Sequence, residues 1–392
     1  MKKVIIGVTG SIAAYKVCDV ISKLKKKEYD IEVFMSEAAA KFISPVTIGA
    51  LINKKVNVDE FEEGYESITH INLVKDADCY IIVPASANTI AKVANGIADS
   101  TLTSSFLAAT CNKIIAPAMN VNMYENIVTQ RNIEKCKKDG IKFVDPASGK
   151  LACGDTGRGK LADIDDIVDM IEYGLHPKPL AHKNVIVTAG PTIEKIDPVR
   201  YITNHSSGKM GYAVAKAAFR LGANVTLITG PTTLKDPYGI ETVKVESAKS
   251  METVIKELYD DADYVVMSAA VSDYRPKVMH DQKIKKQNQL INIELEQNDD
   301  ILAYLGAHKT TQTLCGFAME TENVMGNAKT KFEKKNCDLL VVNDLFEEGA
   351  GFKKDTNKVT FITKNFTESK ALMSKEYLGE LIMDKLLKIK GE

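Results

Sequence analysis

The chain has 392 residues, which is too long for one hydrophobic core and suits two domains of ordinary size. Its formal net charge is −1, with 45% apolar and 26% charged residues. This balance argues against general affinity for nucleic acid, because there is no excess of lysine and arginine to neutralise phosphates. The longest apolar runs are strand-sized and the seven cysteines form no CxxC pair, so we expect no membrane span, zinc site or disulfide framework.

The start of the chain and its cysteine usage indicate a compartment. Residues 4–8 already form an apolar, strand-like run, so we expect no signal peptide before the first core strand. Scattered cysteines without a pairing pattern fit a reducing environment. The sequence therefore predicts a cytoplasmic protein.

The opening of the chain is repeated near its middle. Residues 2–36 and 183–230 each contain a β-branched apolar run, a glycine-bearing turn, a helix-periodic stretch and a second apolar run. The four strands expected from this repeat are Val4–Val8, Ile31–Met35, Val185–Thr188 and Val225–Thr229. This order is typical of parallel doubly wound sheets, in which ligands bind at the carboxyl ends of the strands. The repeat predicts an α/β protein with two such sheets and two nucleotide-type sites.

The rest of the first half continues the alternation. We expect strands at Cys79–Pro84, Lys113–Pro117 and Ile141–Val144, and helices at about Ser86–Asn95, Tyr124–Asp139 and Ile164–Tyr173. Residues Pro146–Gly159 are rich in glycine and too broken for regular structure, which is typical of a functional or mobile loop. A proline-punctuated polar link, Gly174–Lys183, then marks the boundary between a domain over residues 1–178 and another over residues 183–392.

Strands and helices also alternate in the second half, which we expect to close with an edge strand and a helix. We expect a helix at Ser250–Asp260, strands at Tyr264–Ala270, Leu314–Ala318 and Leu339–Asn343, an edge strand at Val359–Ile362 and a C-terminal helix at Lys375–Lys388. Residues Tyr274–Asn298 are basic and are expected to be irregular.

The turn after the first strand departs from a dinucleotide-binding turn. Gly7–Lys16 lacks the GxGxxG pattern, and the second strand ends in Met35–Ser36 without the acidic residue that binds an adenosine ribose. An NAD site is therefore disfavoured. Ser36 and Ser86 instead follow two strands, where helix N-terminal N–H groups suit the single phosphate of a mononucleotide. Taken alone, each serine is better explained as an ordinary helix cap.

Three further residues could take part in chemistry. His70 stands at the start of an expected helix, where a histidine is more often a cap or a packed side chain than a base. Asn120 directly follows a strand, where its amide could bind a carboxylate, although asparagine there is usually part of a turn. Cys153 lies among small residues in the glycine-rich segment, so a reactive thiol and simple loop filling both stay open.

Several segments taken together resemble known families. GSIAAYK, the His70 segment, PASANTIAKVANGIAD, PAMNVNMY and LACGDTGRG occur in the order and spacing of the flavin-containing cysteine decarboxylases. The second half resembles phosphopantothenate–cysteine ligase through AGPTIEKIDPVRYITNHSSGKMG, SAAVSDYRP, KIKK, GFAMET and KTKFEKKNCDLLVVND. The match covers nearly the whole chain, and the run IDPVRYITNHSSG is very specific. The chain thus resembles the bifunctional CoaBC (Dfp) family of coenzyme A biosynthesis, which implies a flavodoxin-like flavoprotein domain followed by a Rossmann-like ligase domain.

The resemblance implies an FMN-dependent decarboxylase in the first half. FMN would oxidise the cysteinyl thiol of 4'-phosphopantothenoylcysteine so that CO₂ can leave, and would then return the electrons to give 4'-phosphopantetheine. His70 matches the family's active-site histidine, Asn120 the amide that holds the departing carboxylate, and Cys153 the proton donor of the last step. The positions that match FMN-binding residues are Gly10, Ser11, Ser36, Ser86 and Asn88.

The resemblance implies a ligase in the second half that uses CTP and Mg²⁺. The carboxylate of 4'-phosphopantothenate would be activated as an acyl-cytidylate, and L-cysteine would then displace CMP. Lys283 matches the catalytic lysine, and Asn204 and Arg200 match residues that hold the acyl substrate. Asp273 matches a nucleotide-site residue near Mg²⁺. The positions that match CTP-binding residues are Met267, Ser268, Ala269, Asp273, Lys283, Asn298, Asp299, Asp300, Ile301, Phe317, Lys331 and Lys335.

One position departs from the family pattern. Asn298–Ile301 reads NDDI, where the family has Asn-Pro-Asp-Ile. Asp299 therefore replaces a proline that would fix the backbone φ angle. The departure puts the loop geometry around cytosine in question, but not the class of activity.

Three alternatives stay open: a flavoprotein decarboxylase or prenyltransferase fused to an inactive domain, a non-catalytic nucleotide sensor, and an NAD oxidoreductase. The complete sets of family residues in both halves count against the first two. The partners that the resemblance implies are 4'-phosphopantothenate, L-cysteine and CTP. It also implies a homo-oligomer with trimeric flavin domains and dimeric ligase domains, and we expect neither nucleic acid nor a membrane as a partner.

Overall fold

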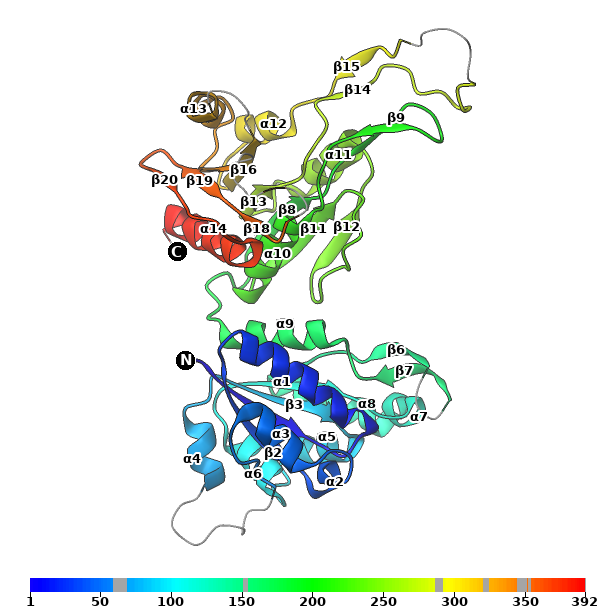
Figure 1. Cartoon of the computed structure of the whole chain (residues 1–392), viewed down its shortest axis with the longest axis vertical. Coiled ribbons are helices and arrows are strands. Elements are labelled where there is room, and N and C mark those ends of the chain that lie inside the picture. Colours follow the sequence, from blue (N-terminus) through cyan, green and yellow to red (C-terminus); the bar gives the residue numbers. More distant parts are fainter. Residues whose placement is uncertain are drawn as a thin grey trace. The chain divides into compact units, whose positions relative to one another are not determined.

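The computed structural model describes residues 1–58, 69–150, 154–285, 292–319, 324–343, 351 and 354–391 (Figure 1). The chain forms two compact units, Met1–His176 and Pro177–Glu392. Each unit has its own sheet and its own buried hydrophobic residues.

The first unit contains a five-stranded parallel sheet in the order β2-β1-β3-β4-β5. Its strands are β1 (Lys3–Val8), β2 (Asp30–Met35), β3 (Cys79–Ala85), β4 (Asn112–Pro117) and β5 (Lys142–Phe143). Every residue of β3 is buried, as expected for a parallel strand covered on both faces. This strand order is that of flavodoxin, so the fold class predicted for the first half is confirmed.

Short helices connect these strands and cover the sheet. They are η1 (Ile12–Lys16), α1 (Val17–Lys26), α2 (Glu37–Ala40), α3 (Pro45–Ile52), α4 (Thr69–Lys75), α5 (Ala87–Ala94), α6 (Thr101–Ala108), α7 (Val121–Glu125), α8 (Ile127–Lys138) and α9 (Ile164–Leu175). The pattern of α1 explains its packing, because Val17, Val20, Ile21 and Leu24 recur at helical spacing and are all fully buried.

Two local predictions for the first unit are wrong. The helix expected over Tyr124–Asp139 is two helices, because Asn126 ends α7 and caps α8 by accepting a hydrogen bond from the Val128 amide at 2.9 Å. The segment expected to lack regular structure contains an antiparallel hairpin of β6 (Ala147–Lys150) and β7 (Thr156–Lys160). These strands are not predictable from the sequence, because their glycines carry no side chain and so remove the apolar–polar alternation that is typical of a strand.

The second unit contains an eight-stranded sheet in the order β12-β11-β8-β13-β16-β17-β19-β20. Its strands are β8 (Asn184–Ala189), β11 (Asn224–Thr229), β12 (Glu241–Lys244), β13 (Tyr264–Met267), β16 (Thr313–Met319), β17 (Leu339–Asn343), β19 (Val359–Ile362) and β20 (Thr367–Ser369). The strands from β12 to β17 pair in parallel, and β19 and β20 are antiparallel additions. Counted along this unit, the parallel part has the order 3-2-1-4-5-6 of the Rossmann fold, which confirms the predicted class.

Helices cover both faces of this sheet (Figure 1). They are α10 (Lys209–Arg220), α11 (Ala248–Leu258), α12 (Ile301–Ala307), α13 (Val324–Lys334) and α14 (Lys375–Lys390). In β8, Val185 and Val187 pack into one cluster with α10 and α14, whereas Ile186 packs into another with α11 and α12. The pleat of a strand buried on both faces requires this alternation.

Three predictions for the second unit need correction. β13 ends at Met267 rather than at Ala270. β19 is not an edge strand, because β20 pairs outside it. The segment expected to be irregular contains two short antiparallel strands, β14 (Tyr274–Pro276) and β15 (Leu295–Gln297). Three-residue strands are too short to show a period in the sequence.

A two-part extension, which we call the arm, leaves this sheet (Figure 1). It consists of the described residues 193–203, 274–285 and 292–297, and its first part is the hairpin of β9 (Ile193–Lys195) and β10 (Tyr201–Thr203). The two parts are joined by a hydrogen bond from the His280 amide to the Ile196 carbonyl at 3.0 Å. Near the C-terminus, β18 (Thr356–Asn357) and β21 (Met373–Ser374) form a separate two-stranded antiparallel sheet.

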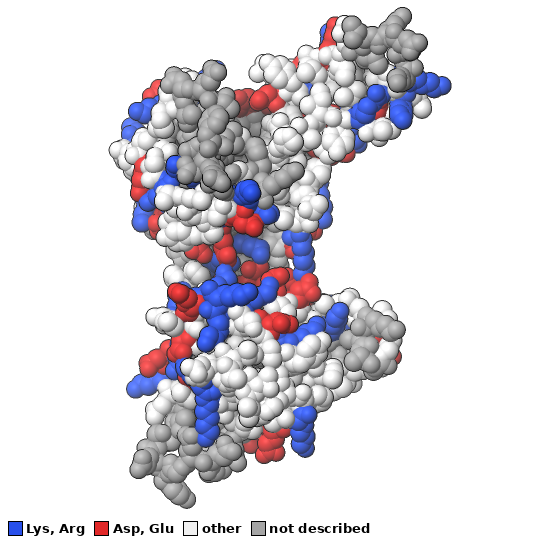
Figure 2. Space-filling model, viewed as in Figure 1, with Lys and Arg blue, Asp and Glu red and all other residues white. Residues whose placement is uncertain are grey.

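The surface of the described residues is mixed in charge. Figure 2 shows basic and acidic side chains interspersed on the visible face. Ion pairs on the described surface include Lys92 with Asp99 at 2.7 Å and Lys244 with Asp236 at 2.9 Å. No helix in the described part of the chain is long and apolar enough to cross a membrane.

Gly379 allows α14 to pack closely on α10. A Cβ atom at this position would lie 2.8 Å from the carbonyl carbon and oxygen of Ala213. We expect Gly379→Val to destabilise the second unit by at least about 2 kcal/mol, because an overpacked contact forces the helices apart. Urea unfolding followed by circular dichroism measures this change. Tyr377→Ala on the exposed side of α14 is the control and should change stability by less than about 0.5 kcal/mol. Equal stability of the two variants would contradict the packing argument.

Candidate active sites

Three turns meet at the carboxyl edge of the first sheet. They follow the neighbouring strands β1, β2 and β3 and contain Ser11, Ser36 and Ser86. Each serine hydroxyl caps the following helix by accepting a hydrogen bond from a backbone amide at 3.2–3.3 Å. The capping interpretation of Ser36 and Ser86 is therefore confirmed. A capping hydroxyl still has its own proton to donate, so capping and cofactor binding are compatible.

Thr9 joins two of these turns. Its buried hydroxyl donates a hydrogen bond to the Pro84 carbonyl at 2.7 Å and accepts one from the Ser86 amide at 2.9 Å. The next residue, Gly10, packs so closely on α2 that a Cβ atom would lie 2.6 Å from the Cβ of Ala38. Sequence reasoning misses Thr9, although a hydroxyl between a strand and a glycine turn is the signal that could identify it.

This edge suits a cofactor with a phosphate group. The strand order reverses between β1 and β3, and ligands of flavodoxin-like sheets bind at this place. α5 begins there, and the first amides of a helix have no intrahelical partner and attract anions. Asn88, in the first turn of α5, is exposed. All five positions predicted for FMN therefore come from adjacent turns of one edge.

Asn120 lies in the turn after β4. Its Oδ1 accepts a hydrogen bond from the Asn122 amide at 2.8 Å and caps α7, while its Nδ2 donates to Oδ2 of Asp155 at 2.9 Å. The turn chemistry expected of an asparagine after a strand is present, and the amide also reaches the end of the β6–β7 hairpin. Cys153 lies outside the described residues. For His70 the structure describes only the backbone, which belongs to α4.

Two glycines hold the β6–β7 hairpin against the Asn120 turn. A Cβ atom at Gly157 would lie 2.6 Å from Cγ2 of Val121, and one at Gly159 would lie 2.4 Å from the Met119 carbonyl oxygen. The Met119 amide donates a hydrogen bond to the Gly159 carbonyl at 3.0 Å. The fold thus brings the strands that flank residues 151–153 in the sequence next to the predicted carboxylate-binding amide.

A pocket of ≈ 610 Å³ lies at the carboxyl edge of the second sheet. The strand order reverses there between β8 and β13, and the Ala270 amide donates a hydrogen bond to the Gly190 carbonyl at 2.9 Å across the two turns. Most residues predicted for the ligase site line this pocket. They are Asn204, Met267, Ser268, Ala269, Asp273, Asn298, Asp299, Asp300, Ile301, Phe317 and Lys331.

Glycines bring the backbone segments around this pocket together. A Cβ atom at Gly230 would lie 1.7 Å from the Pro191 carbonyl oxygen, and one at Gly211 would lie 2.6 Å from the Cβ of Ala189. Gly208, with φ of 77°, stands directly before α10. The N-terminus of α10 therefore opens on the pocket and favours an anion there. Sequence reasoning does not assign the lining residues 205–211, although the run SSGKMG is a signal for them.

Amide and hydroxyl side chains are among the residues that line the pocket. Nδ2 of the buried Asn298 donates a hydrogen bond to the Ser272 carbonyl at 2.8 Å, and its Oδ1 accepts one from Arg275 at 3.1 Å. Nδ2 of Asn204 donates to the Val271 carbonyl at 3.1 Å. Within the described part of the chain, the buried hydroxyls of Ser268 and Ser272 have no hydrogen-bond partner. A bound ligand could satisfy such groups, which are costly to leave unpaired.

Lysines lie at two places beside the pocket. Lys331 lines it, whereas Lys335 does not and instead forms an ion pair with Asp300. Burial opposes ionisation of Asp300, but the bonds from Lys335 and from the Ala303 amide outweigh burial and lower the pKa of Asp300 below its ordinary value. Asp300 is therefore a carboxylate that caps α12 and fixes Lys335 next to the pocket.

Lys375 is a pocket residue that sequence reasoning misses. It begins α14 and is buried, and its ammonium donates hydrogen bonds to the carbonyls of Gly351 at 2.9 Å and Lys354 at 2.7 Å. Burial, together with the nearby charge of Lys209, lowers the pKa of Lys375 to about 8. In the sequence it is the first residue of an amphipathic helix, where a lysine is normally read as solvated.

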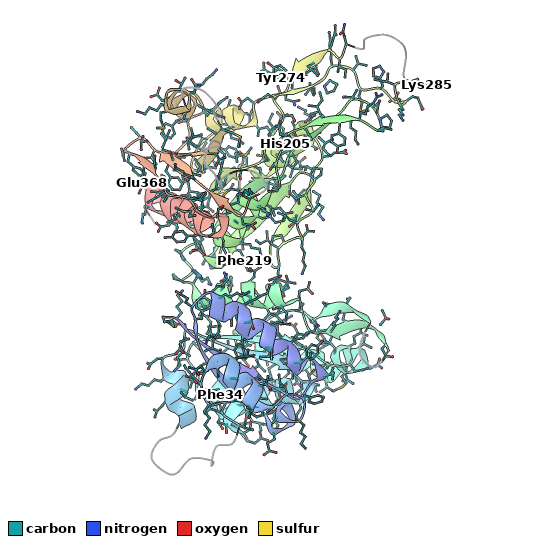
Figure 3. The ribbon with its side chains drawn as sticks, viewed as in Figure 1. Phe34, His205, Phe219, Tyr274, Lys285 and Glu368 are labelled. Atoms are coloured by element: carbon teal, nitrogen blue, oxygen red, sulfur yellow. The ribbon has the colours of Figure 1, made fainter. Side chains whose placement is uncertain are left out.

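Arg200 and Lys283 are not brought into the pocket. Arg200 belongs to the arm, where its guanidinium bonds to Asp197 and to the Ile284 carbonyl. Lys283 is an exposed residue of the arm. Figure 3 shows its neighbour Lys285 at the outer end of the arm, away from His205, which lines the pocket. A single copy of the second unit therefore does not place these two residues together with the other predicted ligase residues.

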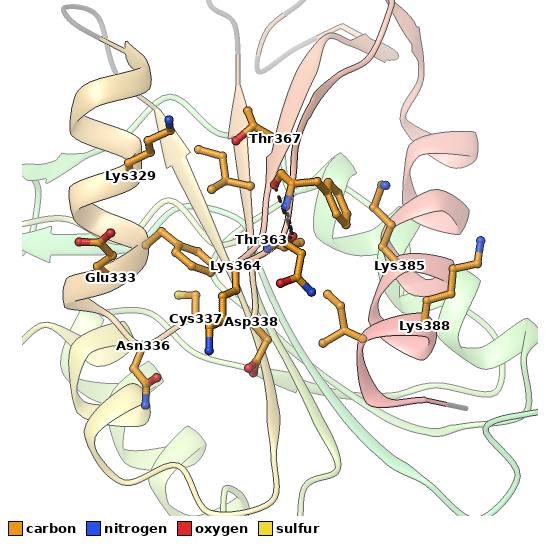
Figure 4. A pocket seen from close by; sticks show the side chains of 15 residues that line it. Lys329, Glu333, Asn336, Cys337, Asp338, Thr363, Lys364, Thr367, Lys385 and Lys388 are labelled. Atoms are coloured by element: carbon orange, nitrogen blue, oxygen red, sulfur yellow. Dashed lines mark hydrogen bonds between the residues drawn. The ribbon is translucent and has the colours of Figure 1, made fainter.

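A larger groove, of ≈ 1130 Å³, lies elsewhere on the second unit (Figure 4). It is lined by α13, α14 and the turn between β19 and β20, with the lysines Lys329, Lys364, Lys385 and Lys388 among its residues. Burial raises the pKa of its cysteine, Cys337, to about 12, so this thiol is inert at neutral pH. None of the predicted site residues that the structure describes lines this groove, so size alone does not identify the site.

Comparisons with known proteins agree with this division. The family model described as "Flavoprotein" matches residues 1–176, and that described as "DNA/pantothenate metabolism flavoprotein C-terminal domain" matches residues 180–389. The coenzyme A biosynthesis bifunctional protein CoaBC of Bacillus subtilis (strain 168) is 46% identical over 369 residues, which are 93% of this chain and 91% of that protein. CoaBC of Escherichia coli (strain K12) is 39% identical over 392 residues, 98% of this chain and 97% of that protein.

One solved structure, the C-terminal domain of a CoaBC protein, is 40% identical and covers 55% of this chain and 100% of that chain, with a TM-score of 0.48. A flavodoxin-like flavoprotein unit joined to a Rossmann-like unit, each with a candidate site at its strand reversal, defines a two-domain α/β enzyme. The chain belongs to the family of bifunctional coenzyme A biosynthesis proteins, CoaBC. It is therefore a bifunctional flavoprotein enzyme of coenzyme A biosynthesis, with a decarboxylase and a ligase activity. An NAD oxidoreductase, a nucleotide sensor and a decarboxylase with an inactive partner do not fit this family.

The approach of Gly159 to the Asn120 turn can be tested. We expect Gly159→Ala to keep its flavin but to lose at least about tenfold in decarboxylase activity, because the hairpin must move away from Asn120. The flavin spectrum and the rate of CO₂ release measure the two effects. Gly149→Ala in β6 is the control: its φ of 156° resembles the 145° of Gly159, but its nearest neighbour would be a flexible lysine side-chain carbon at 3.8 Å. Equal loss in both variants would show that backbone strain, and not the contact with Met119, matters.

Proposed function

We propose that the chain carries out two consecutive steps of coenzyme A biosynthesis. The second unit ligates L-cysteine to 4'-phosphopantothenate with CTP, and the first unit, within residues 1–178, decarboxylates 4'-phosphopantothenoylcysteine to 4'-phosphopantetheine with FMN. The observation that carries this proposal is the pocket at the β8–β13 reversal, whose lining contains eleven residues predicted from the ligase motifs. Residues 183–392 contain all the ligase positions that we assign.

FMN suits the carboxyl edge of the first sheet better than a dinucleotide. Ser11, Ser36 and Ser86 supply hydroxyls beside the first amides of three helical segments, and Gly10 keeps two turns in contact. These groups match a single phosphate, and β2 ends in Met35–Ser36 rather than in the acidic residue that binds an adenosine ribose. When bound, FMN would supply the reversible two-electron oxidation of the substrate thiol.

The chain's own residues would then handle the carboxylate and the protons. Asn120 has an amide hydrogen aimed at a carboxylate already, that of Asp155, so binding a substrate carboxylate is chemistry that its geometry supports. His70 would lie near the thiol, where a neutral imidazole can accept its proton. Cys153 would deliver the proton that converts the decarboxylated, oxidised product into the saturated thiol.

The role of Cys153 has a direct test. We expect Cys153→Ser to bind flavin normally but to stop before the final reduction, because a hydroxyl of similar size is far too weak an acid to deliver the proton at neutral pH. Mass spectrometry should find a decarboxylated product two hydrogens short of phosphopantetheine. Ligation by the same variant is the internal control and should be unchanged. Normal yields of the saturated thiol would remove Cys153 from the mechanism.

In the ligase pocket, anionic groups have several cationic neighbours. CTP would place its phosphates near the N-terminus of α10, near Lys331 and near Lys335, whose charge Asp300 holds in position. Among the described residues, the hydroxyls of Ser268 and Ser272 have no hydrogen-bond partner, so they could bind the base or the acyl group. Asn204 lines the same pocket, with its Nδ2 anchored on the Val271 carbonyl. Phe317 offers a ring against which a base can pack.

Mg²⁺ would accompany the nucleotide. The described residues contain no group of three or more His, Cys, Asp or Glu side chains that could hold a metal ion. This fits Mg²⁺, which is commonly held by one or two carboxylates together with substrate phosphates and water. Asp273, which is exposed and lines the pocket, would be that carboxylate.

The replacement of the family's proline by Asp299 leaves the start of α12 intact. Asp300 caps the helix by accepting a hydrogen bond from the Ala303 amide at 2.9 Å, and the exposed Asp299 lies 3.6 Å from Lys249. Asn298 stays anchored through the Ser272 carbonyl. These contacts support an intact nucleotide loop despite the departure.

Assembly would complete the ligase site. The arm carries Lys283 and Arg200 away from their own pocket, and it exposes apolar side chains such as Tyr201 and Val278, which are 53% and 61% exposed. Both features support a homo-oligomer with paired ligase units, as the resemblance implies. The trimeric arrangement of the flavin units rests on the resemblance alone.

Lys283 should act in the second half-reaction. Negative charge grows on the acyl oxygen and on the leaving CMP, and a flexible ammonium there is worth about 3–4 kcal/mol, a hundred- to thousand-fold in rate. We therefore expect Lys283→Gln to release pyrophosphate and to accumulate phosphopantothenoyl-CMP, because Lys331 and Lys335 still bind the nucleotide. Chromatography of the quenched reaction detects the intermediate, and flavin-dependent decarboxylation by the same variant is the control. An unchanged ligation rate, or loss of CTP binding without an intermediate, would show that Lys283 is only solvated charge.

A further inference from the structure

A buried carboxylate bonds to both parts of the arm. Asp197 is only 2% exposed, although it stands in a turn between two short strands, β9 and β10. Its Oδ1 accepts hydrogen bonds from the backbone amides of Val199 and Arg200, both at 2.8 Å. These two bonds close the turn and would suffice for a local structural role.

The second carboxylate oxygen binds the Arg200 side chain and the other part of the arm. Oδ2 accepts a hydrogen bond from Nε of Arg200 at 2.9 Å and pairs with its Nη2, so the guanidinium is held from two of its nitrogens. The same Oδ2 accepts a hydrogen bond from the Ile284 amide at 3.2 Å. Nη2 of Arg200 in turn donates to the Ile284 carbonyl at 2.9 Å. Asp197, Arg200 and Ile284 thus form one closed network.

This network joins the two predicted ligase residues that lie outside the pocket. Arg200 is itself a member, and Lys283 directly precedes Ile284, whose amide and carbonyl are both bound. The bonds from Arg200, Val199 and Ile284 outweigh burial and hold the pKa of the Asp197 carboxyl well below its usual range. Asp197 is therefore a charged acceptor at any pH near neutrality, and its attraction for the guanidinium persists there.

We infer that Asp197 is a positioning residue for ligation, which fixes the Arg200 guanidinium and the backbone beside Lys283 in one rigid arrangement. The inference rests on the proposed ligase roles of Arg200 and Lys283. Asp197 itself touches neither the pocket nor any reacting atom, since it does not line the pocket and its partners are all in the arm. It acts through the orientation of the two cations.

The substitution Asp197→Asn separates the two functions of the carboxylate. Asparagine has one acceptor oxygen, so it can close the turn or bind Arg200, but not both. We expect kcat/KM for 4'-phosphopantothenate to fall by roughly 10- to 100-fold, as for other small misplacements of catalytic groups. KM for CTP should stay the same, because Lys331, Lys335 and the α10 N-terminus lie outside the arm.

A double-mutant cycle distinguishes positioning from stability. Asp197→Asn, Arg200→Gln and the double variant are compared by steady-state ligation and by thermal unfolding, all as the full chain with flavin. If Asp197 acts through Arg200, its substitution in the Arg200→Gln background should lower kcat/KM far less than in the native background. Asp236→Asn, which removes an exposed carboxylate paired with Lys244 at 2.9 Å, is the matched control and should leave ligation unchanged.

The outcomes separate this inference from the proposed function. If Arg200→Gln ligates normally, the proposed role of Arg200 is wrong. If Arg200→Gln is impaired and Asp197→Asn is not, or if the two losses multiply independently, the positioning role of Asp197 is wrong. If Asp197→Asn fails to fold, Asp197→Glu decides: it keeps the charge but displaces it, so a fall in kcat/KM with unchanged KM for CTP supports the inference, and native kinetics overturn it.

Discussion

The sites of both units depend on the same constraint, the reversal of strand order between two neighbouring parallel strands. Where the connections from such strands leave to opposite faces of the sheet, the carboxyl edge between them cannot be covered by either connection. In the first unit this happens between β1 and β3, where the Thr9 hydroxyl bridges the two turns. In the second unit it happens between β8 and β13, where the Ala270 amide bonds to the Gly190 carbonyl.

The two edges differ in what surrounds them, and this difference separates their chemistry. The first edge has short turns with capping hydroxyls, which suit a compact phosphate and a flat cofactor. The second has a pocket with amides, lysines and two hydroxyls that have no hydrogen-bond partner among the described residues, which suits a triphosphate and a carboxylate together. Close backbone contacts keep both edges in shape, such as Gly10 on Ala38 and Gly230 on Pro191. A glycine at such a contact lets two backbone segments approach closely, and this close approach sets the shape of the site.

Long, strongly apolar elements could be predicted from the sequence. Both ends of β3 and of β8 lie within one residue of the expected bounds, because strands buried on both faces consist of nearly continuous apolar residues. The β6–β7 hairpin could not be predicted, since its glycines erase the alternation of side chains. β14 and β15 cannot be predicted from the sequence, because three residues are too few to define a period.

The sequence by itself determined the doubly wound class, the repeat of that plan in each half, and the family to which the motifs belong. These properties are local, because periodicity and turn residues report the backbone over a few neighbouring positions. Only the tertiary structure decided which of these residues meet. Asn298 reaches Ser272 and lines the pocket, whereas Lys335 turns to Asp300, and Asp197 binds an amide 87 positions away. Such contacts depend on the strand order and on how closely the backbone segments approach one another. Neither property can be predicted from the sequence pattern of a single segment.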